Sequence, residues 1–459
     1  MPTFGLSSQA TEQKVPPALL AEVAPQVAQQ LATEFGGALL APTDAERAAI
    51  RAQILQLVRR AGHQHGLQSG QLSALEEQVL ALTLGYGFLE PFLNAAAAEE
   101  ISEVVLNPAG ALFVQPTEST EFWPVVSDPA GRLTWLAPRS SRSGNLAGYC
   151  PSPLDVEVTL AKLLASVGAQ ANQTNPIVSV KLPPSPRLGA GARVHVVLPP
   201  VAVGAYPALN IRFYVAHPVD TELLVEKWRM LSPRIAAELR TIIQTAGTDI
   251  DTQGRLVVAG ATGSGKTTFL SWLISLIPPA NRLLTAEDPA ELYFDHPNRV
   301  TLEVQHADGR EDSHQGVQML ELVTSAMRMT PAWLIVGEVR GAEALPLLRA
   351  QMSGHNGLST IHANSAENAA ETFTLLVNLF GGSRYSRRAL KELFIRSVDY
   401  IVQLGLDPYG KRRLLSLHRV APQLHGGDIK LLPRFRYDRA RSTAAQPVWQ
   451  EVAYADDDL

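Results

Sequence analysis

The fold of this chain is most constrained by one stretch, residues 256–270, which read "LVVAGATGSGKTTFL". Residues 260–267, "GATGSGKT", match G-x-x-x-x-G-K-[ST], follow an apolar run and precede a helix-like run. Glycines at these positions let consecutive backbone N–H groups turn toward phosphate oxygens at a helix N-terminus, which favours anions. The stretch therefore predicts a strand, a phosphate-binding loop and a helix, in that order.

The residue types of the loop predict a nucleoside triphosphate as its ligand. Lys266 is expected to reach the β- and γ-phosphate oxygens, and the Thr267 hydroxyl to ligate Mg²⁺. A plain turn between a strand and a helix would not require a lysine. The predicted nucleotide-binding residues are Gly260, Thr262, Gly263, Ser264, Gly265, Lys266, Thr267 and Thr268.

Beyond the loop, short apolar runs alternate with helical segments, which is typical of a mostly parallel sheet covered by helices. Glu338 lies in the run "WLIVGEVR", where P-loop enzymes place an acidic residue. A second acidic cluster, "TAEDPAEL", offers Glu287, Asp288 and Glu291. Two acidic strand ends indicate that one carboxylate activates water and the other holds Mg²⁺. Glu291 is equally compatible with an acid at a helix N-terminus, and Asp288 before Pro289 with a turn.

Two histidines flank a Ser-Thr pair in "GHNGLSTIHAN". We predict that His362 contacts the γ-phosphate, whereas for His355 this role and a buried packing role stay equally open. The other histidines that we considered have no such context and are expected to be surface or packing residues: His296, His306, His314 and His418.

The chain has 459 residues, of which 46% are hydrophobic and 18% charged, as in ordinary globular proteins of several domains. Changes in residue composition and apolar patterning along the chain predict five parts. Residues 1–94 hold an N-terminal arm, poorly ordered or loosely helical to about residue 35, and a helical region. They are followed by an α/β domain at 95–218, a linker at 219–235, a nucleotide-binding domain at 236–425 and a C-terminal tail at 426–459.

Charge and apolar patterning exclude several classes of protein. The net charge of −5 creates no overall basic field, and no basic groove interleaved with aromatics is visible, so direct nucleic-acid binding is not expected. No apolar run is long enough to span a membrane, and no signal-peptide pattern is present. The single cysteine, Cys150, is expected to be an inert thiol, which fits a reducing compartment. The predicted location is cytoplasmic.

Four motifs in this order resemble the secretion (traffic) ATPase superfamily of type II and type IV secretion, type IV pilus and tight-adherence pilus systems. They are "GATGSGKT", the acidic "AED..EL", "LIVGEVRG" and the histidine box "SGHNGLSTIHANS". The resemblance covers roughly residues 75–420. Upstream phrases such as "ISEVVLNPAGALFVQ" and "ALNIRF" look most like the tight-adherence and conjugation branches.

The resemblance implies roles for particular residues. It implies a RecA-like motor domain that uses ATP and Mg²⁺, with Glu287 as general base and Glu338 as an acid that helps to hold Mg²⁺ and water. His362 matches the final histidine of the box. Arg193 and Arg212 match arginines that the family's N-terminal domain points at the nucleotide phosphates, a task that suits guanidinium groups. The alternative is a pair of salt-bridged strand arginines.

The resemblance also implies an assembly. The assembly that it implies is a homo-hexameric ATPase at the inner face of the cytoplasmic membrane, expected to work on an inner-membrane platform protein. For Arg340 two roles stay equally open, a contact with the phosphates and a contact at the subunit interface. Three features depart from the family pattern: Ala332 stands where an acid is usual, the histidine box is one residue short for the conjugation branch, and residues 116–151 look inserted. Two other functions stay open, a nucleic-acid-translocating RecA-like motor and a nucleotide-gated scaffold with little turnover.

Overall fold

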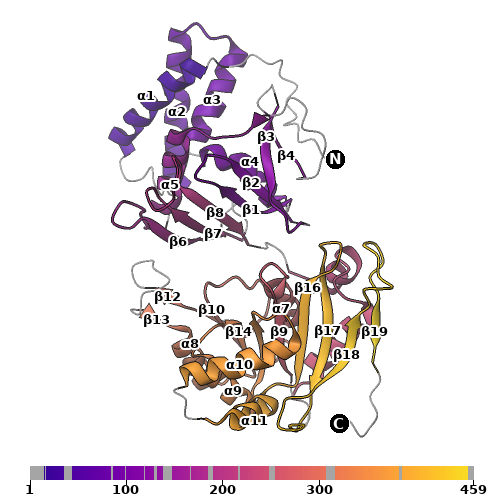
Figure 1. Cartoon of the computed structure of the whole chain (residues 1–459). Coiled ribbons are helices and arrows are strands. Elements are labelled where there is room, and N and C mark those ends of the chain that lie inside the picture. The colour runs from indigo at the N-terminus through magenta and orange to yellow at the C-terminus, as the bar shows by residue number, and fades with distance from the viewer. Residues whose placement is uncertain are drawn as a thin grey trace. The chain divides into compact units, whose positions relative to one another are not determined.

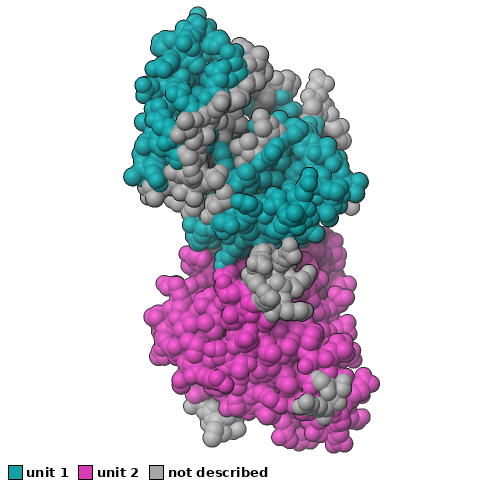
Figure 2. Space-filling model, turned by 90° about the vertical axis from the view of Figure 1, so that its left-hand side faces the viewer, with its two compact units in different colours: residues 1–214 teal, residues 215–459 magenta. Residues whose placement is uncertain are grey.

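The computed structural model describes residues 15, 17–35, 44–83, 86–98, 100–117, 119–128, 132–137, 147–165, 167–184, 190–214, 218–247, 254–306, 316–381 and 385–452. The chain forms two compact units, Met1–Tyr214 and Val215–Leu459 (Figure 2). Within the described residues, every helix is too short or too polar to cross a membrane.

The first unit begins with three helices that pack on one another, α1 (Pro17–Phe35), α2 (Asp44–Gln64) and α3 (Ser69–Thr83) (Figure 1). Their shared core includes Leu31, Ile50, Ile54 and Leu75. Residues 17–35 of the predicted arm form helix α1 and bury one apolar stripe, so the helical alternative agrees with the structure. Residues 1–14 of the arm lie outside the described residues.

The rest of the first unit is an antiparallel sheet with helices packed on one face. Its strand order is β4-β3-β2-β1-β8-β7-β6, and β5 pairs with β3. The bounds are β1 Ile101–Leu106, β2 Leu112–Pro116, β3 Trp123–Ser127, β4 Leu133–Trp135, β5 Ala147–Gly148, β6 Ile177–Leu182, β7 Ala192–Val197 and β8 Ala208–Phe213. The helices are α4 (Glu90–Ala97), preceded by a 3₁₀ turn at Gly87–Leu89, and α5 (Pro153–Ala165). The described part of the 116–151 insertion supplies β3, β4 and β5 at one edge of this sheet.

The second unit is built on a nine-stranded sheet of order β11-β10-β14-β15-β9-β16-β17-β18-β19. The strands from β11 to β16 are parallel, and β17, β18 and β19 extend the sheet in antiparallel fashion. Their bounds are β9 Arg255–Gly260, β10 Leu283–Glu287, β11 Arg299–Glu303, β14 Trp333–Val339, β15 Asn356–Ile361, β16 Tyr400–Leu406, β17 Arg412–Val420, β18 Leu431–Tyr437 and β19 Trp449–Glu451. A separate pair, β12 (Gln305–His306) and β13 (Gly316–Val317), lies outside this sheet.

Helices cover both faces of the nine-stranded sheet (Figure 1). One core packs α6 (Pro233–Thr245) and α7 (Lys266–Ser275) against it, together with a π-helical turn at Leu223–Lys227. The other core packs α8 (Met319–Ala326), α9 (Ala344–Met352), α10 (Ala366–Phe380) and α11 (Arg387–Ser397), with a 3₁₀ turn at Met327–Met329 after α8. These layers confirm the predicted mostly parallel, helix-covered sheet.

The carboxyl ends of parallel strands lie at one edge of a sheet, and this places the candidate site. Gly260 ends β9, Glu287 ends β10, and Glu338 stands one residue before the end of β14. His362 directly follows β15, the strand between β14 and β9. Residues 431–437 and 449–451, which the sequence assigns to a C-terminal tail, are instead strands of this sheet.

Candidate functional site

The phosphate loop joins β9 to α7 in the order that the motif predicts. Gly263 and Gly265 have φ angles of +74° and +91°, where residues with a side chain are strained. Gly265 caps α7, and Lys266 is the first residue of the helix. Thr267 and Thr268 lie half-buried in its first turn. The loop therefore surrounds a helix N-terminus, which attracts anions.

Donors inside the loop converge on the carbonyl oxygen of Ala261. Ser264 donates to it from its backbone N (3.3 Å) and its Oγ (2.8 Å). Lys266, only 9% exposed, donates from Nζ to Ala261 O (3.1 Å) and to Gly260 O (3.0 Å). A phosphate oxygen takes the same kinds of donor. These donors therefore suit the phosphate groups of a nucleotide. In this structure they donate to carbonyl oxygens of the loop itself.

Lys266, His362 and Glu338 form a continuous contact chain. Lys266 Nζ lies 3.5 Å from His362 Nδ1, and His362 Nε2 lies 2.5 Å from Glu338 Oε1. Burial lowers the pKa of His362, Lys266 and Arg340 lower it further, and Glu338 acts in the opposite direction. The Lys266 ammonium can donate to Nδ1, and Nε2 faces the Glu338 carboxylate.

Glu338 is held from one side only. Its Oε2 accepts from Arg340 Nε (2.6 Å) and also contacts Arg340 Nη2. Its buried Oε1 has no hydrogen bond of regular geometry within the described residues, although His362 Nε2 is close. Arg340 thus contacts the acid near the end of β14, and its two open roles stay predictions.

The donors near the loop suit a magnesium ion that arrives with a nucleotide. Within the described residues, no group of three or more His, Cys, Asp or Glu side chains could hold a metal. Mg²⁺ at phosphate sites needs only one or two protein oxygens, because phosphates and waters supply the rest. Thr267 and Glu338 Oε1 offer oxygens of this kind, and we therefore keep both as candidate metal ligands.

Glu287 lies on β10, the strand beside β14, and its carboxylate is 2% exposed. Oε1 accepts from Thr285 Oγ1 (3.1 Å), and Oε2 accepts from the backbone N of Glu291 (2.8 Å) and Leu292 (2.9 Å). The carboxylate thus closes the turn that follows β10. No helix begins at Glu291 in this described segment, so the expectation of an acid at a helix N-terminus is wrong.

Three of the other histidines that the sequence singled out, His296, His355 and His418, occupy packing positions. His355 precedes β15, at the end of the strand opposite His362, and its Nδ1 lies 3.0 Å from Pro331 O. This position favours packing over phosphate contact. His296 and His418 are each 5% exposed, which fits their expected packing role. His306 lies in β12, and His314 lies outside the described residues.

Arg193 and Arg212 lie in the first unit, whereas the phosphate loop lies in the second. They are direct cross-strand partners on β7 and β8. Glu103 on β1 and Lys181 on β6 continue the same row at its two ends. Neighbouring residues of these strands, such as Val194 and Ile211, face the core. The two arginines therefore stand side by side on the face that does not form the core.

Sequence reasoning missed a second arginine group next to the phosphate loop. Arg412, the first residue of β17, donates from Nε to Gly263 O (2.8 Å). Its neighbour Arg413 is 2% exposed and pairs with Asp407. The local sequence "DPYGKRR" indicates a turn followed by positive charge, and nothing in it indicates a contact with residue 263.

A parallel sheet with helices on both faces, and a glycine-rich phosphate loop at its carboxyl edge, define a P-loop nucleotide-binding protein of RecA-like type. A model of the family "Type II/IV secretion system protein" matches residues 171–384. The putative conjugal transfer protein MT3759 of Mycobacterium tuberculosis is 32% identical over 257 residues, which are 56% of this chain and 69% of that protein. The chain belongs to this type II/IV secretion family.

One further relative agrees with this assignment, and one solved structure is similar to part of the chain. The conjugal transfer protein TrbB of Rhizobium radiobacter is 29% identical over 322 residues, 69% of this chain and 83% of that protein. The crystal structure of the VirB11 ATPase from the Brucella suis type IV secretion system, in complex with sulphate, is 24% identical. The aligned region covers 72% of this chain and 96% of the VirB11 chain, with a TM-score of 0.35. The resemblance to secretion ATPases is confirmed.

Proposed function

We propose that this protein hydrolyses ATP as a cytoplasmic homo-hexamer at the inner face of the cytoplasmic membrane. It powers a secretion, pilus-assembly or conjugation machine through an inner-membrane platform protein. The observation that carries the hydrolytic part is the contact chain Lys266–His362–Glu338 beside a loop whose donors converge on one point. Membership of the secretion family and the names of the conjugal transfer relatives support the machine.

The phosphate loop binds the β- and γ-phosphates by exchanging partners. Lys266 Nζ and the two Ser264 donors leave the carbonyl oxygens of their own loop and donate to phosphate oxygens. Thr267 and Glu338 would hold the Mg²⁺ that accompanies the nucleotide, which would supply positive charge to the phosphates. Catalysis then rests on positioning and charge stabilisation rather than on a covalent intermediate.

His362 responds to the nucleotide because it lies between the lysine and the glutamate. When Lys266 turns to the γ-phosphate, His362 Nδ1 loses its donor and the ring is left with Glu338 alone. Glu287 orients the attacking water after its carboxylate gives up at least one of the backbone N–H groups that it now accepts from.

Arg193 and Arg212 supply positive charge to the nucleotide from the first unit. Like charges directly opposite one another across strands repel, and a polyanion between their guanidinium groups removes that repulsion. Two charged forks side by side also suit the oxygens of a phosphate chain.

One observation favours a second function, a nucleotide-gated scaffold with little turnover. Both carboxylate oxygens of Glu287 accept hydrogen bonds, two of them from the backbone of the following turn. A base held in this way aligns no water. On this alternative, ATP binding changes the shape of the protein, and hydrolysis contributes little.

The test is ATP turnover by the purified protein with Mg²⁺, together with its mass in solution, for wild type, Lys266→Ala and Lys227→Ala. Lys227 is an exposed lysine of the same unit and serves as the matched control. We expect a hexamer whose turnover is abolished by Lys266→Ala and unchanged by Lys227→Ala. Tight ATP binding without turnover in the wild type would contradict the ATPase and support the scaffold.

A further inference from the structure

The carbonyl of Gly263, at the tip of the phosphate loop, is bound by Arg412. The Arg412 Nε donates to it at 2.8 Å. A peptide unit is planar and its C=O and N–H groups point in opposite directions. The next N–H, that of Ser264, accordingly points back into the loop and donates to Ala261 O (3.3 Å). Arg412 thereby favours the peptide orientation that a phosphate site needs, with the N–H inward and the oxygen outward.

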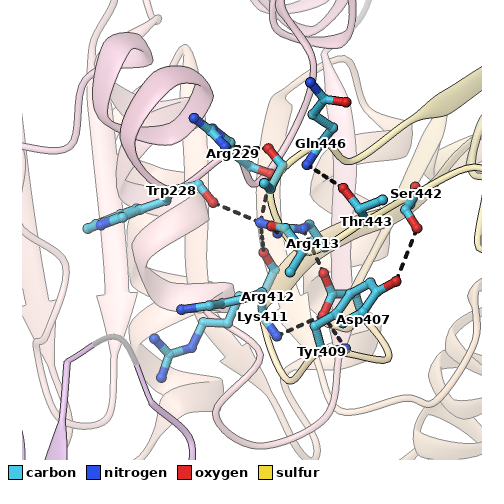
Figure 3. A network of polar contacts seen from close by, with 12 residues as sticks. Trp228, Arg229, Asp407, Tyr409, Lys411, Arg412, Arg413, Ser442, Thr443 and Gln446 are labelled. Atoms are coloured by element: carbon cyan, nitrogen blue, oxygen red, sulfur yellow. Dashed lines mark hydrogen bonds and ion pairs between the residues drawn. The ribbon is translucent and has the colours of Figure 1, made fainter.

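Arg412 is placed by its neighbour Arg413, whose side chain points to the other face of the strand. The Arg413 guanidinium is buried and donates to Asp407 Oδ2 (3.0 Å), Trp228 O (2.8 Å) and Arg229 O (2.9 Å) (Figure 3). A buried guanidinium with several partners tolerates little displacement, since each lost partner leaves a buried charge less well solvated. The position of the Arg412 backbone is therefore determined by this network.

Asp407 closes the turn between β16 and β17 on the other side of the pair. Its side chain is inaccessible to solvent, and its Oδ1 accepts from the backbone N of Tyr409 and of Lys411, both at 2.9 Å. The Tyr409 hydroxyl in turn donates to Ser442 O (3.3 Å), in the loop before β19 (Figure 3). The turn that carries Arg412 is thus fixed both within itself and by the C-terminal part of the sheet.

The same hairpin holds the segment 228–230, which leads from the start of the second unit into α6. Leu414 N donates to Met230 O (2.8 Å), next to the two carbonyls that Arg413 binds. Arg229 has a φ of +52°, a strained value for a residue with a side chain, so its conformation depends on these contacts. A Cβ on Gly265 would lie 3.4 Å from both Met230 Cε and Arg412 Cδ. Segment 228–230 and the hairpin therefore both approach the phosphate loop.

We propose that Arg412 is a positioning residue of the phosphate loop, and that Arg413 and Asp407 make its position depend on segment 228–230. The inference rests on the proposed function, because Arg412 acts through the nucleotide contacts of the loop. A shift of segment 228–230 changes nucleotide affinity by moving the Arg412–Gly263 contact. Arg412 itself touches neither the reacting phosphate nor the attacking water.

The first experiment compares Arg412→Ala, Arg412→Lys and Arg419→Ala. Arg419 is an exposed arginine of the same strand and serves as the matched control. We measure the affinity for Mg·ADP by calorimetry, KM and kcat for ATP, and the unfolding midpoint. Loss of one charge-assisted hydrogen bond predicts about five- to tenfold weaker ADP binding for Arg412→Ala. KM rises more than kcat falls, Arg412→Lys recovers part of the affinity, and the unfolding midpoint matches that of Arg419→Ala.

The second experiment tests the dependence on the buried pair with Asp407→Asn, which keeps the size of the side chain. We expect weaker ADP binding in this variant as well. In the double variant with Arg412→Ala, the two losses should be far from additive, because both act through one contact. Additive losses would overturn the link between the buried pair and the loop.

The outcomes separate this inference from the proposed function. If the wild type binds ADP and Arg412→Ala binds it as tightly as Arg419→Ala does, the positioning role is overturned and the proposed function stands. If the wild type binds no nucleotide, both are overturned. If Arg412→Ala weakens ADP binding but also lowers the unfolding midpoint below that of Arg419→Ala, Arg412 is a structural residue and the inference fails.

Discussion

The glycines of the phosphate loop are needed for different physical reasons. Gly263 and Gly265 adopt positive φ angles, and their constraint is conformational. Gly260 is constrained by space. A Cβ on it would lie 2.4 Å from Ser264 Oγ and 3.0 Å from the backbone oxygen of Leu404. The pattern G-x-x-x-x-G-K-T thus combines backbone and packing requirements in one short motif.

Replacement of Gly260 by alanine should therefore destabilise the second unit and weaken nucleotide binding. The Ser264 hydroxyl can rotate away, but Leu404 O belongs to the neighbouring strand β16 and cannot. Overpacking of this kind costs about 1–3 kcal/mol of unfolding free energy, measured by chemical denaturation. Gly148→Ala is the control, because its Cβ would meet nothing within 4 Å. Equal stability of the two variants would refute the packing argument.

At single residues, the sequence predicts what a local motif encodes and misses what the sheet brings together. Lys266, Glu338 and His362 could be predicted because each lies in a motif at a strand end. Arg412 could not, because it contacts a residue 149 positions away. That contact exists only because β16 pairs in parallel with β9 and its turn ends beside the loop.

At the scale of elements, two segments of the second unit escaped prediction, and one helix of the first was predicted only as one of two alternatives. Strand β18 contains Pro433, and a proline within an apolar run argues against an internal strand. The sheet accommodates it at an irregularity of pairing between Leu417 and His418 of β17. Helix α1 lies in the segment predicted to be poorly ordered or loosely helical. Leu19, Val23, Val27 and Leu31 recur every four residues and are buried, but the prolines among them weaken that period in the sequence.

Strand β17 also gives the second unit a predicted pH dependence. His418 is buried, and burial lowers its pKa below the ordinary value of 6.5, with Glu367 opposing this effect and Arg436 adding to it. The unfolded chain therefore binds a proton at a higher pH than the folded chain does. The stabilising contribution is complete above pH 6.5 and is lost as the pH falls through the lowered pKa.

When the pH falls from 7 to 5, we expect the free energy of unfolding to decrease less for His418→Gln than for the wild type. The measurement is denaturant unfolding at each pH, with His425→Gln as an exposed control. The control should follow the wild type. A pH dependence in His418→Gln as steep as in the wild type would show that other groups carry it.

At the scale of the whole molecule, the residues of the candidate site are divided between two units. The second unit holds the phosphate loop, Glu338 and His362, and the first holds Arg193 and Arg212. The proposed function assigns a role to both sets. Segment 228–230 contacts the hairpin that carries Arg412, and both lie in the second unit.

The most direct measurement is ATP turnover together with ATP affinity on the same samples of wild type and Glu338→Gln. The substitution keeps the shape of the side chain and removes the charge that the proposed site uses for Mg²⁺ and water. We predict that Glu338→Gln still binds ATP but that its turnover rate falls by at least about 100-fold. Turnover equal to that of the wild type would contradict the assignment of Glu338 and, with it, the proposed hydrolytic site.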